Sequence, residues 1–135
     1  MTLSCDQLIS RQAMYDFNPN FGEQAGFTPK AGTPAATAQA NKGLVCGWMN
    51  QTSRETVEVS AANLPPAQIA AMKAKLNASS TPVSAFATPG YFTVSGGIGQ
   101  AETFDGTFWV TARSAFFSEA GDAAQLIDTA VKSLG

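Results

Sequence analysis

The side chains that could carry chemistry in this chain are scattered carboxylates and two cysteines, because the sequence contains no histidine. Histidine is the commonest general base and a frequent metal ligand, so most familiar catalytic and metal-binding arrangements are excluded. Among the carboxylates, Asp105 is best explained as a turn residue and Asp122 as a helix cap, and we expect Glu58 on a solvated strand face. We therefore predict no catalytic residue, no cofactor and no metal. The carboxylates considered as acid–base pairs are Asp16, Glu23, Glu102, Asp105, Glu119 and Asp122.

Two short patterns resemble ligand-binding loops but lack the residues that define them. Asp16, Asn18 and Asn20 alternate like calcium ligands, yet the position of the bidentate glutamate of an EF-hand is occupied by Phe27. The segment Ser95–Gly99 is rich in glycine but has neither a P-loop lysine nor dinucleotide-binding glycine spacing. We expect a turn network at the first pattern and a hairpin turn at the second.

Cys5 and Cys46 allow three interpretations. A reactive thiol would need a nearby base or a Cys-x-x-Cys pair, and the chain offers neither. Two buried free thiols in a cytosolic protein are a second alternative. We favour a disulfide, which would close a long loop and place the protein outside the cytoplasm.

Composition narrows the possible partners. Charged residues make up 13% of the chain, against about 25% in a typical globular protein, and small polar residues replace them. Such a composition is common in exported proteins. Basic residues occur singly, so the sequence has no cluster of positive charge that could bind nucleic acid or an anionic membrane surface. Because residues 1–4 are too short for a signal peptide, we expect membrane attachment only through an N-terminal segment preceding this sequence.

Hydrophobic periodicity and turn residues predict one α+β domain over residues 1–135, with an antiparallel sheet of about five strands. N-terminal, central and C-terminal helices are expected to cover this sheet. Residues 18–43 are expected to form a long loop that a Cys5–Cys46 bridge would close. The expected helices cover residues 4–17, with a break near Ser10, residues 65–76, and a segment from Asp122 onward. The expected strands cover residues 44–50, 55–62, 91–95, 99–104 and 107–112. A second loop is expected over residues 78–89.

Aromatic side chains are the candidates for a binding surface. We expect these aromatic residues to pack mainly in the core, and the alternative is that at least one contributes to a binding surface, where a partner would contact the 18–43 loop and nearby aromatic side chains. The possible partner-binding residues are Tyr15, Phe17, Phe21, Phe27, Trp48 and Trp109.

Several segments resemble a family of uncharacterised exported or lipoprotein domains from actinobacteria. The resembling segments are Cys5 before Leu8-Ile9-Ser10, Tyr15–Phe21, Cys46-Gly47-Trp48 and Gly106–Val110. Such domains are similar to the PsbP-like α+β sandwich. The resemblance implies a location in the cell envelope, a bridge between the two cysteines and a non-enzymatic role.

We accordingly expect a non-catalytic, extracytoplasmic binding or interaction module, secreted or membrane-anchored, that acts as a monomer on a protein or glycan of the envelope. The alternatives are a structural envelope domain and a hydrolase that works without histidine. A cleft of exposed aromatic residues would favour the binding module, and a close pair of buried carboxylates would favour the enzyme.

Overall fold

The computed structural model describes residues 2–135 and contains one antiparallel sheet of seven strands with five helices. The strands lie in the order β1-β2-β3-β7-β6-β5-β4. In chain order the elements are α1 (Cys5–Leu8), α2 (Arg11–Phe17), β1 (Phe21–Glu23), α3 (Pro34–Ala40), β2 (Leu44–Asn50), β3 (Thr56–Asn63), α4 (Pro66–Ser79), β4 (Thr81–Val83), β5 (Gly90–Ser95), β6 (Ile98–Asp105), β7 (Phe108–Ser114) and α5 (Ala120–Leu134).

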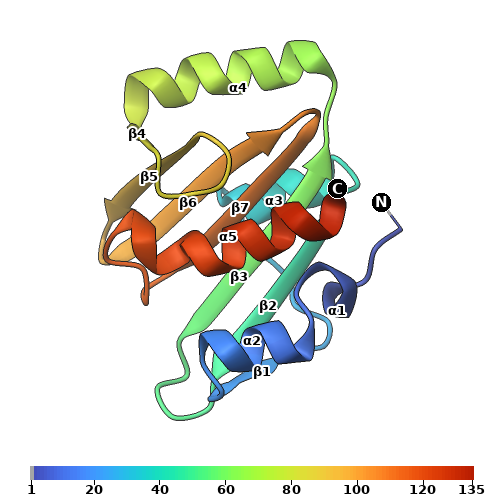
Figure 1. Cartoon of the computed structure of the whole chain (residues 1–135), viewed down its shortest axis with the longest axis vertical. Coiled ribbons are helices and arrows are strands. Elements are labelled where there is room, and N and C mark those ends of the chain that lie inside the picture. Colours follow the sequence, from blue (N-terminus) through green and yellow to red (C-terminus); the bar gives the residue numbers. More distant parts are fainter. Residues whose placement is uncertain (1) are drawn as a thin grey trace.

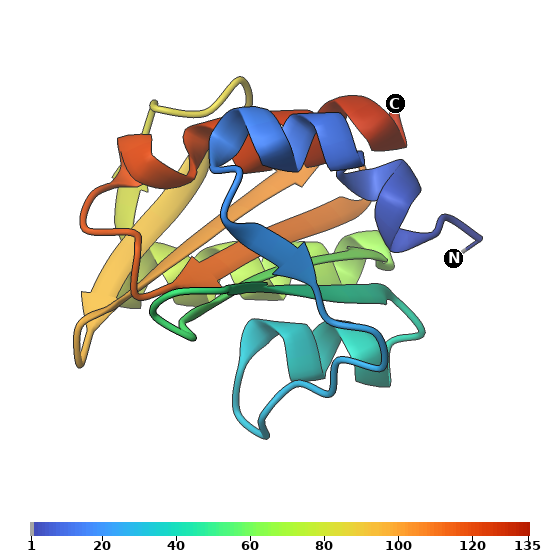
Figure 2. The ribbon, with the colours of Figure 1, turned by 90° about the horizontal axis from the view of Figure 1, so that it is seen from below.

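Helices cover both faces of the sheet (Figures 1 and 2). Helices α1, α2 and α5 lie on one face, which we call the α5 face, and α3 and α4 lie on the other, which we call the α4 face. The larger core lies on the α5 face, where strand residues alternating inward meet the apolar side of α5. Its fully buried members include Val57, Val59, Val110, Leu126 and Ile127.

The predicted hairpin and meander are confirmed. Strands β2 and β3 pair antiparallel, as do β5, β6 and β7 in succession. The break in the N-terminal helix is also confirmed, because Ser4 caps α1 and Ser10 caps α2 through its side-chain bond to Ala13. Ser4 and Gln7 form the predicted capping box.

The expected loops over 18–43 and 78–89 were wrong in part, since they contain β1, α3 and β4, and the sheet has seven strands instead of five. Strands β1 and β4 are three residues long and lie at the two edges of the sheet. Helix α3 begins where Thr33 caps the chain and Pro34 takes the first helical position. The C-terminal helix begins before Asp122, whose side chain instead bonds to the backbone N–H of the N-cap residue Glu119.

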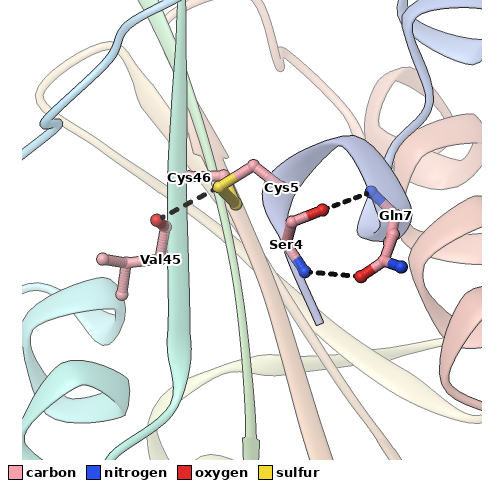
Figure 3. The surroundings of a disulfide bond; sticks show 5 residues. All are labelled: Ser4, Cys5, Gln7, Val45 and Cys46. Atoms are coloured by element: carbon pink, nitrogen blue, oxygen red, sulfur yellow. Dashed lines mark hydrogen bonds between the residues drawn. A yellow bond between two sulfur atoms is a disulfide. The ribbon is translucent and has the colours of Figure 1, made fainter. Parts of the chain in front are cut away.

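A disulfide joins Cys5 at the start of α1 to Cys46 on β2, with 5.7 Å between the two Cα atoms (Figure 3). The Sγ atom of Cys5 also lies 3.6 Å from the carbonyl oxygen of Val45. The predicted bridge is therefore present, and it fixes a four-residue helix that is too short to be stable alone.

Candidate functional site

A pocket of about 340 Å³ lies on the α4 face, with walls from α3 and α4 and a floor from the sheet. We call it the α3–α4 pocket. Its volume is at the lower end of the range for ligand-binding pockets, which is roughly 300–1,000 Å³. The pocket lining includes Thr33, Pro34 and Thr37 on the α3 side, Gln68, Met72, Lys75, Leu76 and Ser79 on α4, and Gln100, Glu102 and Trp109 on the floor.

The floor is organised around Glu102 of β6, which is 6% exposed. Trp109 Nε1 donates a hydrogen bond to one carboxylate oxygen at 3.0 Å, and Gln100 Nε2 donates to the other at 3.1 Å. Burial raises the pKa of the Glu102 carboxyl, and these two hydrogen bonds only partly oppose that shift. The pocket thus presents a fixed carboxylate whose two hydrogen-bond donors are neutral.

Strand register explains why polar groups gather there. Glu102 lies opposite Thr111 on β7, and Thr111 lies opposite Ser60 on β3, so the three side chains form a row across the sheet. The Ser60 and Thr111 hydroxyls hydrogen-bond to each other and are almost fully buried. A polar row therefore runs beneath the two helices of the α4 face, where an apolar layer would be usual.

Helix α4 forms an adaptable wall. Ile69 is its only buried residue, while Met72 and Leu76 are half-buried along the pocket. Gln68 Nε2 donates to Asn41 Oδ1 at 3.4 Å, which links α4 to the end of α3. Because methionine has several low-energy shapes, this wall can adjust to a ligand.

A second hollow of about 510 Å³ lies beside the pocket and contains an ion pair. Arg113 Nη1 lies 3.3 Å from Glu58 Oε2, and the Glu58 side chain is 15% exposed. The expectation that Glu58 lies on a solvated face was therefore wrong, because residues 24–30 line the same hollow over it. Burial raises the pKa of Glu58, and Arg113 partly opposes this. Within residues 2–135, Glu58 Oε1 and Gln24 Oε1 are buried acceptors without a hydrogen-bond partner.

Three of the aromatic candidates come together at one end of the α5 face. Phe17 and Phe21 lie 6.0 Å apart between ring centroids, and Phe17 also contacts Phe117 at 6.5 Å. Tyr15 is 62% exposed and lines a separate hollow with Phe21. This group is a core cluster with one exposed neighbour.

The other three candidates are separated by the sheet. Trp48 is buried in the core of the α5 face, whereas Trp109 is 2% exposed and lies under the α3–α4 pocket. Phe27 covers Gly47 on the α4 face so closely that a Cβ there would lie 2.6 Å from its ring. The six aromatic residues do not form one surface.

The Asp16–Asn20 segment forms the expected turn network. Asn18 Oδ1 accepts a hydrogen bond from the backbone N–H of Asn20. The side-chain amide of Asn20 donates to Asn50 Oδ1 and to the Thr52 hydroxyl oxygen. Asp16 accepts instead from Gln12. In the part of the chain that the structure describes, no group of three or more carboxylate or cysteine side chains is placed to hold a metal ion.

Sequence reasoning named Glu102 as a carboxylate and Trp109 as an aromatic candidate, but it did not join them. Both positions follow from alternation along β6 and β7, because Trp109 pairs with Phe104, which lies two residues from Glu102 on β6, so the two side chains share one face. Alternation cannot show that this face lies beneath helices. Met72 and Leu76 of the α4 wall were predicted only as an apolar stripe.

The pocket is thus defined by its own geometry, with a buried carboxylate on a polar floor and an adaptable helix for a wall. No protein-family model, no curated protein and no solved structure matches the chain.

Proposed function

We propose that the chain is a non-catalytic binding module that acts outside the cytoplasm and binds its ligand in the α3–α4 pocket. The observation that carries this proposal is the buried Glu102 carboxylate, held by Trp109 and Gln100 at the floor of an accessible pocket whose walls combine apolar and polar side chains. Ligand sites characteristically combine apolar walls with a few fixed polar groups. Glu102 is the pocket's single carboxylate, and its two donors are neutral, which suits recognition better than paired acid–base chemistry.

The disulfide supports the location, because such bonds persist mainly in oxidising compartments. We further propose that the protein is a monomer in the cell envelope, where it is secreted or anchored. Its fold would be a PsbP-like sandwich, as in the actinobacterial exported domains that the sequence resembles. Support for that finer assignment comes from the sequence resemblance and from the agreement of an antiparallel sheet covered by helices on both faces. The partner would be an envelope protein or glycan.

The two tryptophans provide a direct test by NMR. The indole N–H of Trp109 bonds to Glu102 in the pocket, whereas Trp48 lies on the opposite face and serves as an internal reference. Soluble cell-wall glycan fragments and short peptides would be titrated into ¹⁵N-labelled protein. We expect a binding compound to move the Trp109 indole signal and leave the Trp48 signal in place.

A matched pair of variants at Thr37 localises the binding. Thr37 is exposed on α3 and lines the pocket, so Thr37→Phe should fill the entrance while Thr37→Ala keeps it open. We expect the phenylalanine variant to lose the ligand-induced shift and the alanine variant to retain it. Binding that moves other signals, leaves Trp109 unmoved and ignores both variants would refute the pocket as the site.

A further inference from the structure

The charge of Glu102 sets a requirement on the ligand. The carboxylate is 6% exposed, and its hydrogen-bond donors, Gln100 and Trp109, are both neutral. Neither of the ion pairs identified within residues 2–135 includes it. A buried carboxylate without a cation is costly, and a ligand that brings a positive charge relieves that cost. We propose that the α3–α4 pocket binds a primary ammonium group on an aliphatic stem and pairs it with Glu102, an inference that rests on the proposed function.

Glu102 has acceptor capacity left for such a group. An ionised carboxylate offers about four lone-pair sites, and one side-chain hydrogen bond reaches each of the two Glu102 oxygens. An ammonium group carries three donors and no acceptor, so it complements the remaining sites. Gln100 and Trp109 also fix the orientation of the carboxylate, which reduces the entropy lost when a ligand binds.

The other polar side chains of the pocket are used within the chain. The Thr33 hydroxyl donates to the Lys30 carbonyl and caps α3, and the Thr37 hydroxyl bonds back to the Thr33 carbonyl. Gln68 donates to Asn41, and the Ser79 hydroxyl donates to a carbonyl of its own helix. These bonds leave few side chains for a ligand with many hydroxyl groups, such as a sugar ring.

The walls fit the stem of such a ligand. Pro34, Met72 and Leu76 provide apolar surface between the entrance and the floor. The methylene groups of an alkylammonium would be buried against them, which favours binding by removing apolar surface from water. A terminal charge on an apolar stem is the chemistry of a lysine side chain and equally of a free alkylamine.

The positive charge of Lys75 allows a test of whether the pocket prefers a cationic ligand. Its exposed side chain lines the pocket from α4, and it forms no ion pair with Glu102 within 4.0 Å. A positive charge at that position opposes a cationic ligand and favours an anionic one. Removing it should therefore strengthen the binding of an ammonium compound.

The test compares three probes on the intact chain by following the Trp109 indole signal. The probes are n-pentylamine, the uncharged 1-pentanol of matched length, and Nα-acetyl-lysine N-methylamide. We expect n-pentylamine to bind at least about tenfold more tightly than 1-pentanol, as a charged hydrogen bond is worth about 1.5–3 kcal/mol. If the blocked lysine binds more tightly than n-pentylamine, the ligand is a lysine side chain of a partner protein; the reverse order indicates a free amine.

Three variants assign the effect to the pocket. Glu102→Gln should weaken n-pentylamine binding about tenfold or more and leave 1-pentanol unchanged. The matched control Glu58→Gln removes the buried carboxylate of the neighbouring hollow and should leave both affinities unchanged. Lys75→Gln changes an exposed residue and should increase the affinity for n-pentylamine, which keeps the test decisive even if Glu102→Gln fails to fold.

The outcomes separate this inference from the proposed function. Equal binding of n-pentylamine and 1-pentanol, or weaker amine binding in Lys75→Gln, would overturn the ammonium assignment. If neutral compounds move the Trp109 signal and n-pentylamine does not, the binding pocket stands and its proposed ligand class is wrong. If every binding compound leaves Trp109 unmoved, both proposals are wrong.

Discussion

Reduction of the Cys5–Cys46 disulfide should lower the stability of the protein substantially. The bond joins residues 41 positions apart, and the intervening chain contains most of α1, all of α2, β1 and α3, and part of β2. In the reduced unfolded chain these residues gain conformational freedom that the bond had removed. The folded state changes less, because Cys46 stays buried in β2.

The magnitude follows from the length of the closed loop. In the chain-entropy model, a loop of this size restricts the unfolded state by about 13 cal/mol/K, or about 4 kcal/mol at 25 °C. A chain of 135 residues unfolds with an entropy of about 0.28 kcal/mol/K near its midpoint. Dividing the loss of about 4 kcal/mol by this unfolding entropy predicts a melting temperature about 14 °C lower after reduction.

Calorimetry of the oxidised and reduced protein measures this difference. Cys5 and Cys46 are the only cysteines in the sequence, so reductant acts on one bond and alkylation with intact-mass analysis confirms its state. The double variant C5A/C46A should melt at least as low as the reduced protein, since it also loses two side chains. A fully reduced protein that melts within about 3 °C of the oxidised one would refute the loop-entropy reasoning.

Three further changes test the polar floor. Trp109→Phe removes the indole donor from Glu102 and should cost about 1.5–3 kcal/mol of unfolding free energy in urea, whereas an unchanged midpoint would mean that another donor replaces it. Ser60→Ala and Thr111→Val should each lower the free energy of unfolding by about 1–3 kcal/mol, because each leaves the other residue's buried hydroxyl unpaired. The double variant should lose less than the sum of the two single variants. Additive losses would show that the two hydroxyls are not coupled. Since burial raises the pKa of Glu102 above 4.5, the folded state holds its proton more tightly than the unfolded chain does. Stability should therefore fall as the pH rises from about 4.5 through the raised pKa, and this fall should be smaller in Glu102→Gln, as urea midpoints across pH will show.

The parts of the fold that the sequence predicted are those with strong periodicity or clear end signals. Strand β3 alternates apolar and polar residues, and α5 carries an apolar stripe that ends up against the sheet. Strands β1 and β4 are too short to show any alternation. Helix α3 is mostly Ala and Thr, so its only signals were the Thr33 cap and Pro34.

The candidate site was harder to predict because its parts are defined by tertiary structure. Alternation placed Glu58 and Ser60 together on one side of β3, but it could not show that this side lies under residues 24–30 and helix α3. The stripe of Ile69, Met72 and Leu76 predicted that α4 packs on something apolar. Which face of the sheet it covers, and that Glu102 lies beneath it, depends on the path of the chain between strands.

The strand order has a consequence for how the chain could be divided. The first three strands lie together on one side of the sheet and the last four on the other, and the β3–β7 pairing joins the two groups. A cut between Leu64 and Pro65 would leave the disulfide and the β1–β3 group in one fragment, and α4, β4–β7 and α5 in the other. The two fragments would meet along the seven residue pairs of β3 and β7. Reassembly of the fold from two such fragments would therefore depend on the β3–β7 pairing and on the packing of α5 against α1 and α2.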